Sequence, residues 1–169
     1  LRKAVAIKVL RPELSRSTAF VERFRREARA AGRLDNAHSI RVLDSGQTPE
    51  GGVYLVMELF VSENLAKILA REGALRVERA LNVTRQILVA LEDAHNAGIL
   101  HRDLKPENVL VALGPDLQEL AKVCDYGIAK IAGEVDDRLT VTGSQFGTPL
   151  YMSPESSRGE VTDARGDLY

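Results

Sequence analysis

Residues that could take part in chemistry are concentrated in one short segment. Residues 101–108 read His-Arg-Asp-Leu-Lys-Pro-Glu-Asn and stand between a helical pattern and a short run of β-branched residues. Within six positions, Asp103, Lys105 and Asn108 offer a proton acceptor, a cation and an amide oxygen. Taken alone, Asp103 or Asn108 is more typical of a solvated loop or a turn. Their joint occurrence reverses that expectation and predicts a catalytic loop.

A second charged residue stands inside an apolar strand pattern. Lys8 lies in Ala-Val-Ala-Ile-Lys-Val-Leu, residues 4–10, and burial of an ammonium group is costly unless it is paired. An edge-strand lysine that points to solvent is the ordinary alternative. Glu27, in the next helical segment, offers a partner, although its four arginine neighbours would also suit a solvated helix face. We predict a Lys8–Glu27 ion pair.

The elements that must position these residues follow from hydrophobic periodicity. Strand patterns cover 4–10, 40–43, 53–60, 109–111 and 120–123, and helical patterns cover 17–34, 64–71 and 77–97. Ser17 is the expected N-cap of the first helix, and Gly98 is the expected residue after the end of the last one. From 125 to 155 the chain is polar and has no sustained period, which is typical of a functional or mobile segment.

Composition limits the classes of function. The chain has 169 residues, a formal net charge of −1 and 44% apolar residues, as in an ordinary soluble protein with no general attraction for nucleic acid. No apolar run reaches the roughly 18 residues that span a bilayer. The single cysteine, Cys124, cannot form an intramolecular disulfide, so a cytoplasmic location is expected.

The segment 101–108 has the pattern of the protein-kinase catalytic loop, and the sequence resembles the eukaryotic-type serine/threonine protein kinases of bacteria. The resemblance continues in order along the chain. Val-Ala-Ile-Lys at 5–8 resembles the third strand of the small lobe. Asp-Tyr-Gly at 125–127 resembles the metal-binding triplet, and Ser-Pro-Glu at 153–155 resembles the end of the activation segment.

The resemblance implies a two-lobed α+β kinase fold that is truncated at both ends. A partial small lobe would occupy 1–58, with a hinge at about 58–61. A partial, mainly helical large lobe would occupy 62–169 and include an activation segment at 125–155. The glycine-rich loop and most of the large lobe's central helix have no counterpart in the sequence. We therefore expect little or no kinase activity from this chain alone.

The implied reaction is transfer of the γ-phosphoryl group of ATP to serine or threonine hydroxyls of protein substrates, with Mg²⁺. Asp103 would orient and deprotonate the acceptor hydroxyl, and Lys105 would lie near the γ-phosphate. Asn108 and Asp125 would bind Mg²⁺ through hard oxygen atoms. Lys8, held by its ion pair, would contact the α- and β-phosphates.

The residues that the resemblance places around the nucleotide come from both lobes. They are Ala6, Lys8, Met57, Glu58, Phe60, Leu110, Cys124 and Asp125. Backbone groups of Glu58 and Phe60 would face the adenine edge, and Met57 would be the gatekeeper. Ala6, Met57 and Leu110 also fit plain core packing, and Cys124 also fits an inert small hydrophobic residue.

The substrate class and the regulation follow from the same resemblance. Gly-Thr-Pro-Leu-Tyr at 147–151 is a serine/threonine-type pattern, in which Thr148 would bond near the catalytic aspartate and help to seat the acceptor hydroxyl. Arg102 resembles the arginine of kinases whose activation segment is phosphorylated. Thr140 and Thr142 are the predicted phosphorylation sites, although any polar loop contains hydroxyls. Dimerisation for autophosphorylation stays open.

Some positions depart from the family pattern. Tyr126 stands in place of phenylalanine in the metal-binding triplet and brings a hydroxyl that needs a partner, and Ser39 ends a turn that usually reads His-Pro-Asn-Ile. Asp167 keeps the pattern of an aspartate that holds the catalytic loop by backbone hydrogen bonds.

An alternative function is a pseudokinase that binds nucleotide or a partner without turnover. The presence of all the catalytic residue types argues against it. Bacterial relatives are often anchored by a transmembrane helix outside the catalytic domain, and the resemblance implies the same option for the parent protein.

Overall fold

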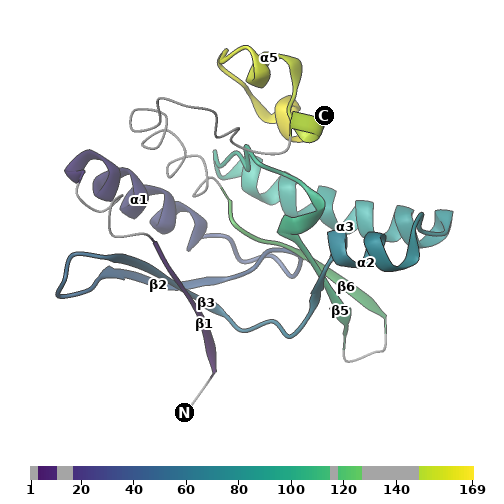
Figure 1. Cartoon of the computed structure of the whole chain (residues 1–169), viewed down its shortest axis with the longest axis horizontal. Coiled ribbons are helices and arrows are strands. Elements are labelled where there is room, and N and C mark those ends of the chain that lie inside the picture. The colour runs from purple at the N-terminus through teal and green to yellow at the C-terminus, as the bar shows by residue number, and fades with distance from the viewer. Residues whose placement is uncertain (1–3, 11–16, 115–117, 127–148) are drawn as a thin grey trace.

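Two small antiparallel sheets organise the chain (Figure 1). The computed structural model describes residues 4–10, 17–114, 118–126 and 149–169. Each sheet has three strands, in the orders β1-β3-β2 and β4-β5-β6. The predicted site residues that the structure describes lie on these sheets or in the segments that lead into or out of their strands, except for Glu27, which lies on a helix.

The first sheet consists of β1 (Val5–Val9), β2 (Val42–Gln47) and β3 (Val53–Glu58). The central strand β3 is the most apolar, and its side chains at 53 and 55 are almost fully buried. In β1, Ile7 and Val9 are exposed at 61% and 62%. Since side chains alternate along a strand, Ala6 and Lys8 point to the opposite face.

The first helix, α1 (Thr18–Ala31), covers one face of this sheet (Figure 1). The predicted N-cap is confirmed, because the Ser17 side chain accepts a hydrogen bond from the backbone N–H of Phe20 at 3.3 Å. Buried residues of α1 pack on β3 in one core cluster, made of Phe20, Val21, Phe24, Ala28, Val53 and Leu55. The helix ends at Ala31, three residues before its predicted end. The backbone N–H groups of Arg33 and Leu34 then donate to carbonyl groups three positions earlier, as in a 3₁₀ turn.

The second sheet consists of β4 (Glu63–Asn64), β5 (Val109–Leu113) and β6 (Glu119–Val123). Helices α2 (Leu65–Glu72) and α3 (Val77–Asn96) lie beside it. The short strand β4 was not predicted, because two residues carry no periodicity.

A stretch at residues 38–40 ties the first sheet to the second. The backbone N–H of Ile40 donates to the Val123 carbonyl at 2.8 Å, and the N–H of Val123 donates to the His38 carbonyl at 2.8 Å. The predicted strand at 40–43 is therefore wrong at its start, since Ile40 bonds to β6 and β2 begins only at Val42. We call residues 38–40 the linking segment.

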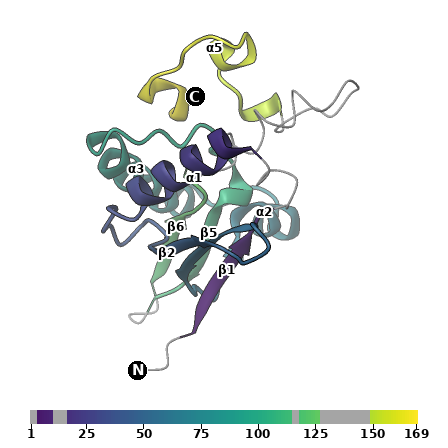
Figure 2. The ribbon, with the colours of Figure 1, turned by 90° about the vertical axis from the view of Figure 1, so that its left-hand side faces the viewer.

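The C-terminal part forms short turns of helix on the side of α3 away from both sheets (Figure 2). They are η3 (Pro149–Tyr151), α5 (Pro154–Ser157) and η4 (Ala164–Asp167). Within the described part of the chain, no helix has the length and apolar character needed to cross a membrane.

Candidate active site

The loop at 99–105 begins where α3 ends. Gly98 adopts φ +73°, a left-handed conformation that suits glycine, as predicted for the residue after the helix. The N–H of Ile99 then donates to the Ala94 carbonyl at 2.8 Å, which turns the chain back along the helix. The loop ends in the short 3₁₀ helix η2 (Pro106–Asn108), which leads into β5.

Asp167 holds this loop from the far end of the chain. Its carboxylate accepts hydrogen bonds from the backbone N–H of His101 at 2.8 Å and of Arg102 at 2.7 Å. This confirms the role predicted for Asp167. His95 places its Nε2 2.8 Å from the same carboxylate. Arg102 has φ +65°, a strained conformation that these bonds stabilise.

His101 connects the loop to the end of β6. Its side chain is fully buried, and its Nδ1 accepts a bond from the Asp103 N–H at 3.3 Å. Nε2 therefore carries the proton of the neutral ring and donates to the Cys124 carbonyl at 2.9 Å. Burial lowers the pKa of His101, and the bond to Cys124 only partly opposes this. The neutral ring thus acts as a fixed structural link.

Asp103 lies at the centre of a short polar network. Its Oδ2 is 2.7 Å from Lys105 Nζ and 3.3 Å from Asn108 Nδ2. The amide of Asn108 also donates to the Asp103 backbone carbonyl at 2.8 Å. Among the residues that the structure describes, no donor contacts Asp103 Oδ1. The carboxylate is therefore oriented by one oxygen and leaves the other available as an acceptor.

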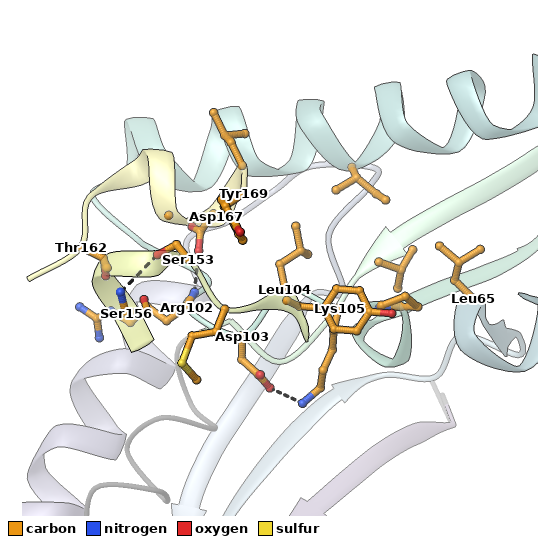
Figure 3. A pocket seen from close by; sticks show the side chains of 17 residues that line it. Leu65, Arg102, Asp103, Leu104, Lys105, Ser153, Ser156, Thr162, Asp167 and Tyr169 are labelled. Carbon is orange, nitrogen blue, oxygen red and sulfur yellow. Dashed lines mark hydrogen bonds and ion pairs between the residues drawn. The ribbon is translucent and has the colours of Figure 1, made fainter. Parts of the chain in front are cut away.

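A pocket opens in front of this network (Figure 3). Arg102, Asp103 and Lys105 form its polar side, and Leu65 and Leu104 are among its apolar lining residues. The other wall comes from the C-terminal segment, with Ser153, Ser156, Thr162 and Tyr169. The carboxylate of Asp103 thus borders a pocket that has both polar and apolar walls.

The predicted ion pair of Lys8 is wrong in its partner. Lys8 Nζ lies 2.8 Å from Asp125 Oδ1, whereas Glu27 contacts Arg26 at 3.4 Å. Within the described residues, no ion pair joins Lys8 to Glu27. Asp125, two residues after the end of β6, is the carboxylate within contact distance of Lys8. The Asp125 backbone is again left-handed, at φ +65°.

A second cleft lies between β1, the segment after β3, and β5. All eight residues predicted to surround the nucleotide line it, together with Ile40 and Leu59. Lys8 and Asp125 form its charged side. The structure thus brings together side chains that are up to 119 positions apart in the sequence, from Ala6 to Asp125.

Glu58, at the end of β3, is fixed from two directions. Its Oε1 is 2.6 Å from Lys122 Nζ and accepts the Arg41 backbone N–H at 2.9 Å. Burial alone would raise the pKa of Glu58, but the two hydrogen bonds and the positive charges of Lys122 and Arg41 together lower it. Lys122 also lies 5.4 Å from the ring centre of Phe60. Sequence reasoning missed Lys122, because nothing local indicates a partner 64 positions away.

The cysteine in the cleft is expected to be unreactive. Burial raises the pKa of Cys124 to about 12, and the neighbouring Asp125 acts in the same direction. At pH 8 roughly one thiol in ten thousand would then be ionised. We expect iodoacetamide at pH 8 to modify the folded protein far more slowly than the urea-unfolded protein, as followed by mass spectrometry. Equal rates would contradict this prediction.

The donor set of Asn108 and Asp125 suits Mg²⁺. Both side-chain bonds of Asn108 are donated by its amide nitrogen, so its amide oxygen remains available within the described region. The backbone joins the two proposed ligands, because the N–H of Cys124, the residue before Asp125, donates to the Asn108 carbonyl at 3.0 Å. In the described residues no three His, Cys, Asp or Glu side chains converge on a common point. Two protein oxygens match an ion that takes its other ligands from phosphate and water.

Three predicted residues lie outside the described residues: Thr140, Thr142 and Thr148. Their proposed roles stay predictions. One pair that sequence reasoning did not join is Ser39 and Tyr126, whose hydroxyl oxygens are 2.8 Å apart. The sequence marked both residues as unusual, since each departs from the family pattern, but it did not indicate that they are partners.

Comparison with known proteins agrees with this geometry. The protein kinase domain family matches residues 1–169. The chain is 47% identical to the serine/threonine-protein kinase pkn3 of Myxococcus xanthus, covering 100% of this chain and 31% of that protein. It is 37% identical to the probable serine/threonine-protein kinase PknB of Corynebacterium glutamicum, covering 99% of this chain and 26% of that protein.

The fold has a close counterpart among solved structures. The kinase domain of Mycobacterium tuberculosis PknI matches with a TM-score of 0.76 at 30% identity, covering 98% of this chain and 59% of that chain. The predicted α+β kinase fold is thereby confirmed. The chain spans between about a quarter and a third of the length of the curated relatives named above. The family match over every residue and the kinase relatives place the chain in the protein kinase domain family.

Proposed function

We propose that this chain forms the catalytic part of a serine/threonine protein kinase, which transfers the γ-phosphoryl group of ATP to protein hydroxyls. The observation that carries the proposal is the Asp103 network with Lys105 and Asn108, beside the cleft that contains Lys8 and Asp125. The kinase relatives support the substrate class, because their names state serine/threonine specificity.

The two sheets would form the two lobes. Residues 1–58, with the first sheet and α1, are the proposed small lobe, and 62–169 belong to the large lobe. The hinge is proposed at about 58–61, where the adenine would meet the backbone of Glu58 and Phe60. Its support is that the end of β3 lines the same cleft as Lys8 and Leu110.

In the proposed reaction, Asp103 accepts the proton of the substrate hydroxyl. Its Oδ2 is held by Lys105 and Asn108, so Oδ1 is the oxygen left to accept that proton. Lys105 also brings a positive charge to the place where the phosphoryl group would pass. Positioning and charge neutralisation of this kind provide most of the catalysis in phosphoryl transfer.

Lys8 would neutralise charge on the nucleotide phosphates. An ammonium group has three donors, so one can stay on Asp125 while the others bind phosphate oxygens. Mg²⁺, when held by Asn108 and Asp125, would supply further positive charge at the phosphates.

Further roles are proposed from the sequence alone. Thr148 would seat the acceptor hydroxyl, and phosphorylation of Thr140 and Thr142 would regulate the enzyme, with dimerisation as a route to autophosphorylation. We propose a cytoplasmic location for the reaction, supported by the free thiol of Cys124. Mass spectrometry of active protein that found both threonines unmodified would exclude their proposed phosphorylation.

The test is phosphoryl transfer from radiolabelled ATP to a generic protein by the full-length protein. We expect labelled phosphoserine and phosphothreonine. Replacing Lys8 by methionine should lower the rate by about a hundredfold or more, because a charge that stabilises the transferring group is lost. The control is Lys67→Met, since Lys67 is exposed on α2. Tight Mg²⁺-ATP binding without any transfer would instead favour the pseudokinase alternative.

A further inference from the structure

A buried pair of hydroxyl groups lies directly beside the proposed metal ligand Asp125. Ser39 Oγ and Tyr126 Oη are 2.8 Å apart, and the two residues are 1% and 3% exposed. Tyr126 Oη is also 3.4 Å from the Ala90 carbonyl oxygen. Both bonds form when Ser39 donates to Tyr126 and Tyr126 donates to Ala90. Two departures from the family pattern, 87 positions apart, thus satisfy each other.

The backbone of Asp125 needs support from its neighbours. Its φ of +65° is unfavourable for a residue with a side chain, and such conformations persist only where the surroundings enforce them. On one side, Cys124 is fixed by backbone bonds to Asn108 and to the His101 ring. On the other side stands Tyr126. The direction of the Asp125 carboxylate therefore depends on how firmly Tyr126 is held.

Ser39 is a fixed point from which to hold Tyr126. It is the middle residue of the linking segment, whose two neighbours are both hydrogen-bonded to the Val123 backbone. The Tyr126 ring packs in an apolar cluster and lies 5.1 Å from the His101 ring. Packing places the ring, and the hydroxyl bond adds a directional constraint at its end. Burial raises the pKa of Tyr126 to about 12, so the phenol keeps its proton near neutral pH.

We propose that the Ser39–Tyr126 hydrogen bond positions Asp125 for Mg²⁺, which makes Ser39 and Tyr126 positioning residues for phosphoryl transfer. This inference rests on the proposed function, in which Asp125 binds the metal. Loss of the bond should weaken the contribution of Mg²⁺ to nucleotide binding. Binding of nucleotide without metal should be unaffected, because neither hydroxyl lines the nucleotide cleft.

The test compares ADP binding with Mg²⁺ and with EDTA, by calorimetry on the full-length protein. The variants are Ser39→Ala, Tyr126→Phe and their combination. Tyr54→Phe is the matched control, since it removes the same hydroxyl from β3, in the first sheet. Mg²⁺ should raise the affinity for ADP, and we expect this rise to be about fivefold smaller in each single variant than in the unaltered protein. A fivefold change is the effect expected for one hydrogen bond. The combined variant should lose about as much as one single variant, because both changes remove the same contact.

Each other outcome overturns the inference in a distinguishable way. An unaltered Mg²⁺ gain in Tyr126→Phe would overturn it, even if urea unfolding showed lower stability, because the bond would then be only structural. Additive losses in the combined variant would show that the two hydroxyls act separately. If the unaltered protein gained no affinity from Mg²⁺, the proposed metal site itself would fail, and this inference with it.

Discussion

Replacing Asp103 by asparagine is expected to lower kcat for phosphoryl transfer by about a hundredfold to ten-thousandfold. The amide keeps the size of the side chain but cannot accept the proton of the substrate hydroxyl. Binding of Mg²⁺-ADP should change little, because Asp103 lines the pocket beside the C-terminal segment and not the nucleotide cleft. Steady-state kinetics with a protein substrate, together with nucleotide calorimetry, separates the two effects.

A second carboxyl variant provides the control for this prediction. Glu92 is exposed on α3, and Glu92→Gln makes the same chemical change away from both clefts. Its kcat should stay close to that of the unaltered protein. A residual rate for Asp103→Asn within tenfold of the unaltered rate would contradict the role of Asp103 as proton acceptor.

Replacing Asp167 by alanine is expected to lower the free energy of unfolding by about 2–6 kcal/mol. Two backbone N–H groups, of His101 and Arg102, would lose their acceptor, and each such loss costs about 1–3 kcal/mol when the group is buried. The strained backbone of Arg102 would also lose its support. Urea unfolding followed by circular dichroism measures the change.

The chain offers a matched control four residues earlier. Asp163 is exposed, and its carboxylate contacts only Arg165 among the described residues. Asp163→Ala should therefore destabilise the protein much less than Asp167→Ala. Asp167→Asn, which keeps one acceptor oxygen, should fall between the unaltered protein and Asp167→Ala. Equal losses for Asp163→Ala and Asp167→Ala would contradict the anchoring role.

Local features of the fold could be predicted from the sequence, because their causes are local. The cap at Ser17 and the left-handed Gly98 each depend on a few neighbouring residues. The start of β2 could not be predicted in the same way. Ile40 is apolar and suits a strand, but its N–H bonds to Val123, 83 positions away. Hydrophobic periodicity reports only on neighbouring residues and cannot indicate so distant a partner.

The candidate site shows the same limit more sharply. The order of motifs identified Lys8 and Asp125 as members of one site, and they line one cleft. Which carboxylate pairs with Lys8 is decided by competition in three dimensions, and there the prediction of Glu27 was wrong. Likewise, the hydroxyl of Tyr126 indicated a missing partner, but only the fold identifies Ser39.

The linking segment has a mechanical consequence. Within the described residues, two backbone connections join the first sheet to the second: the chain that leaves β3, and the hydrogen bonds of residues 38–40 to Val123. Two attachments define an axis, so rotation about that axis is the softest relative motion left to the sheets. Because the strand order is β1-β3-β2, β1 lies at the opposite edge of the first sheet from β2, the strand that follows the linking segment. The 2.8 Å contact between Lys8 and Asp125 is therefore among the first to lengthen when the cleft opens.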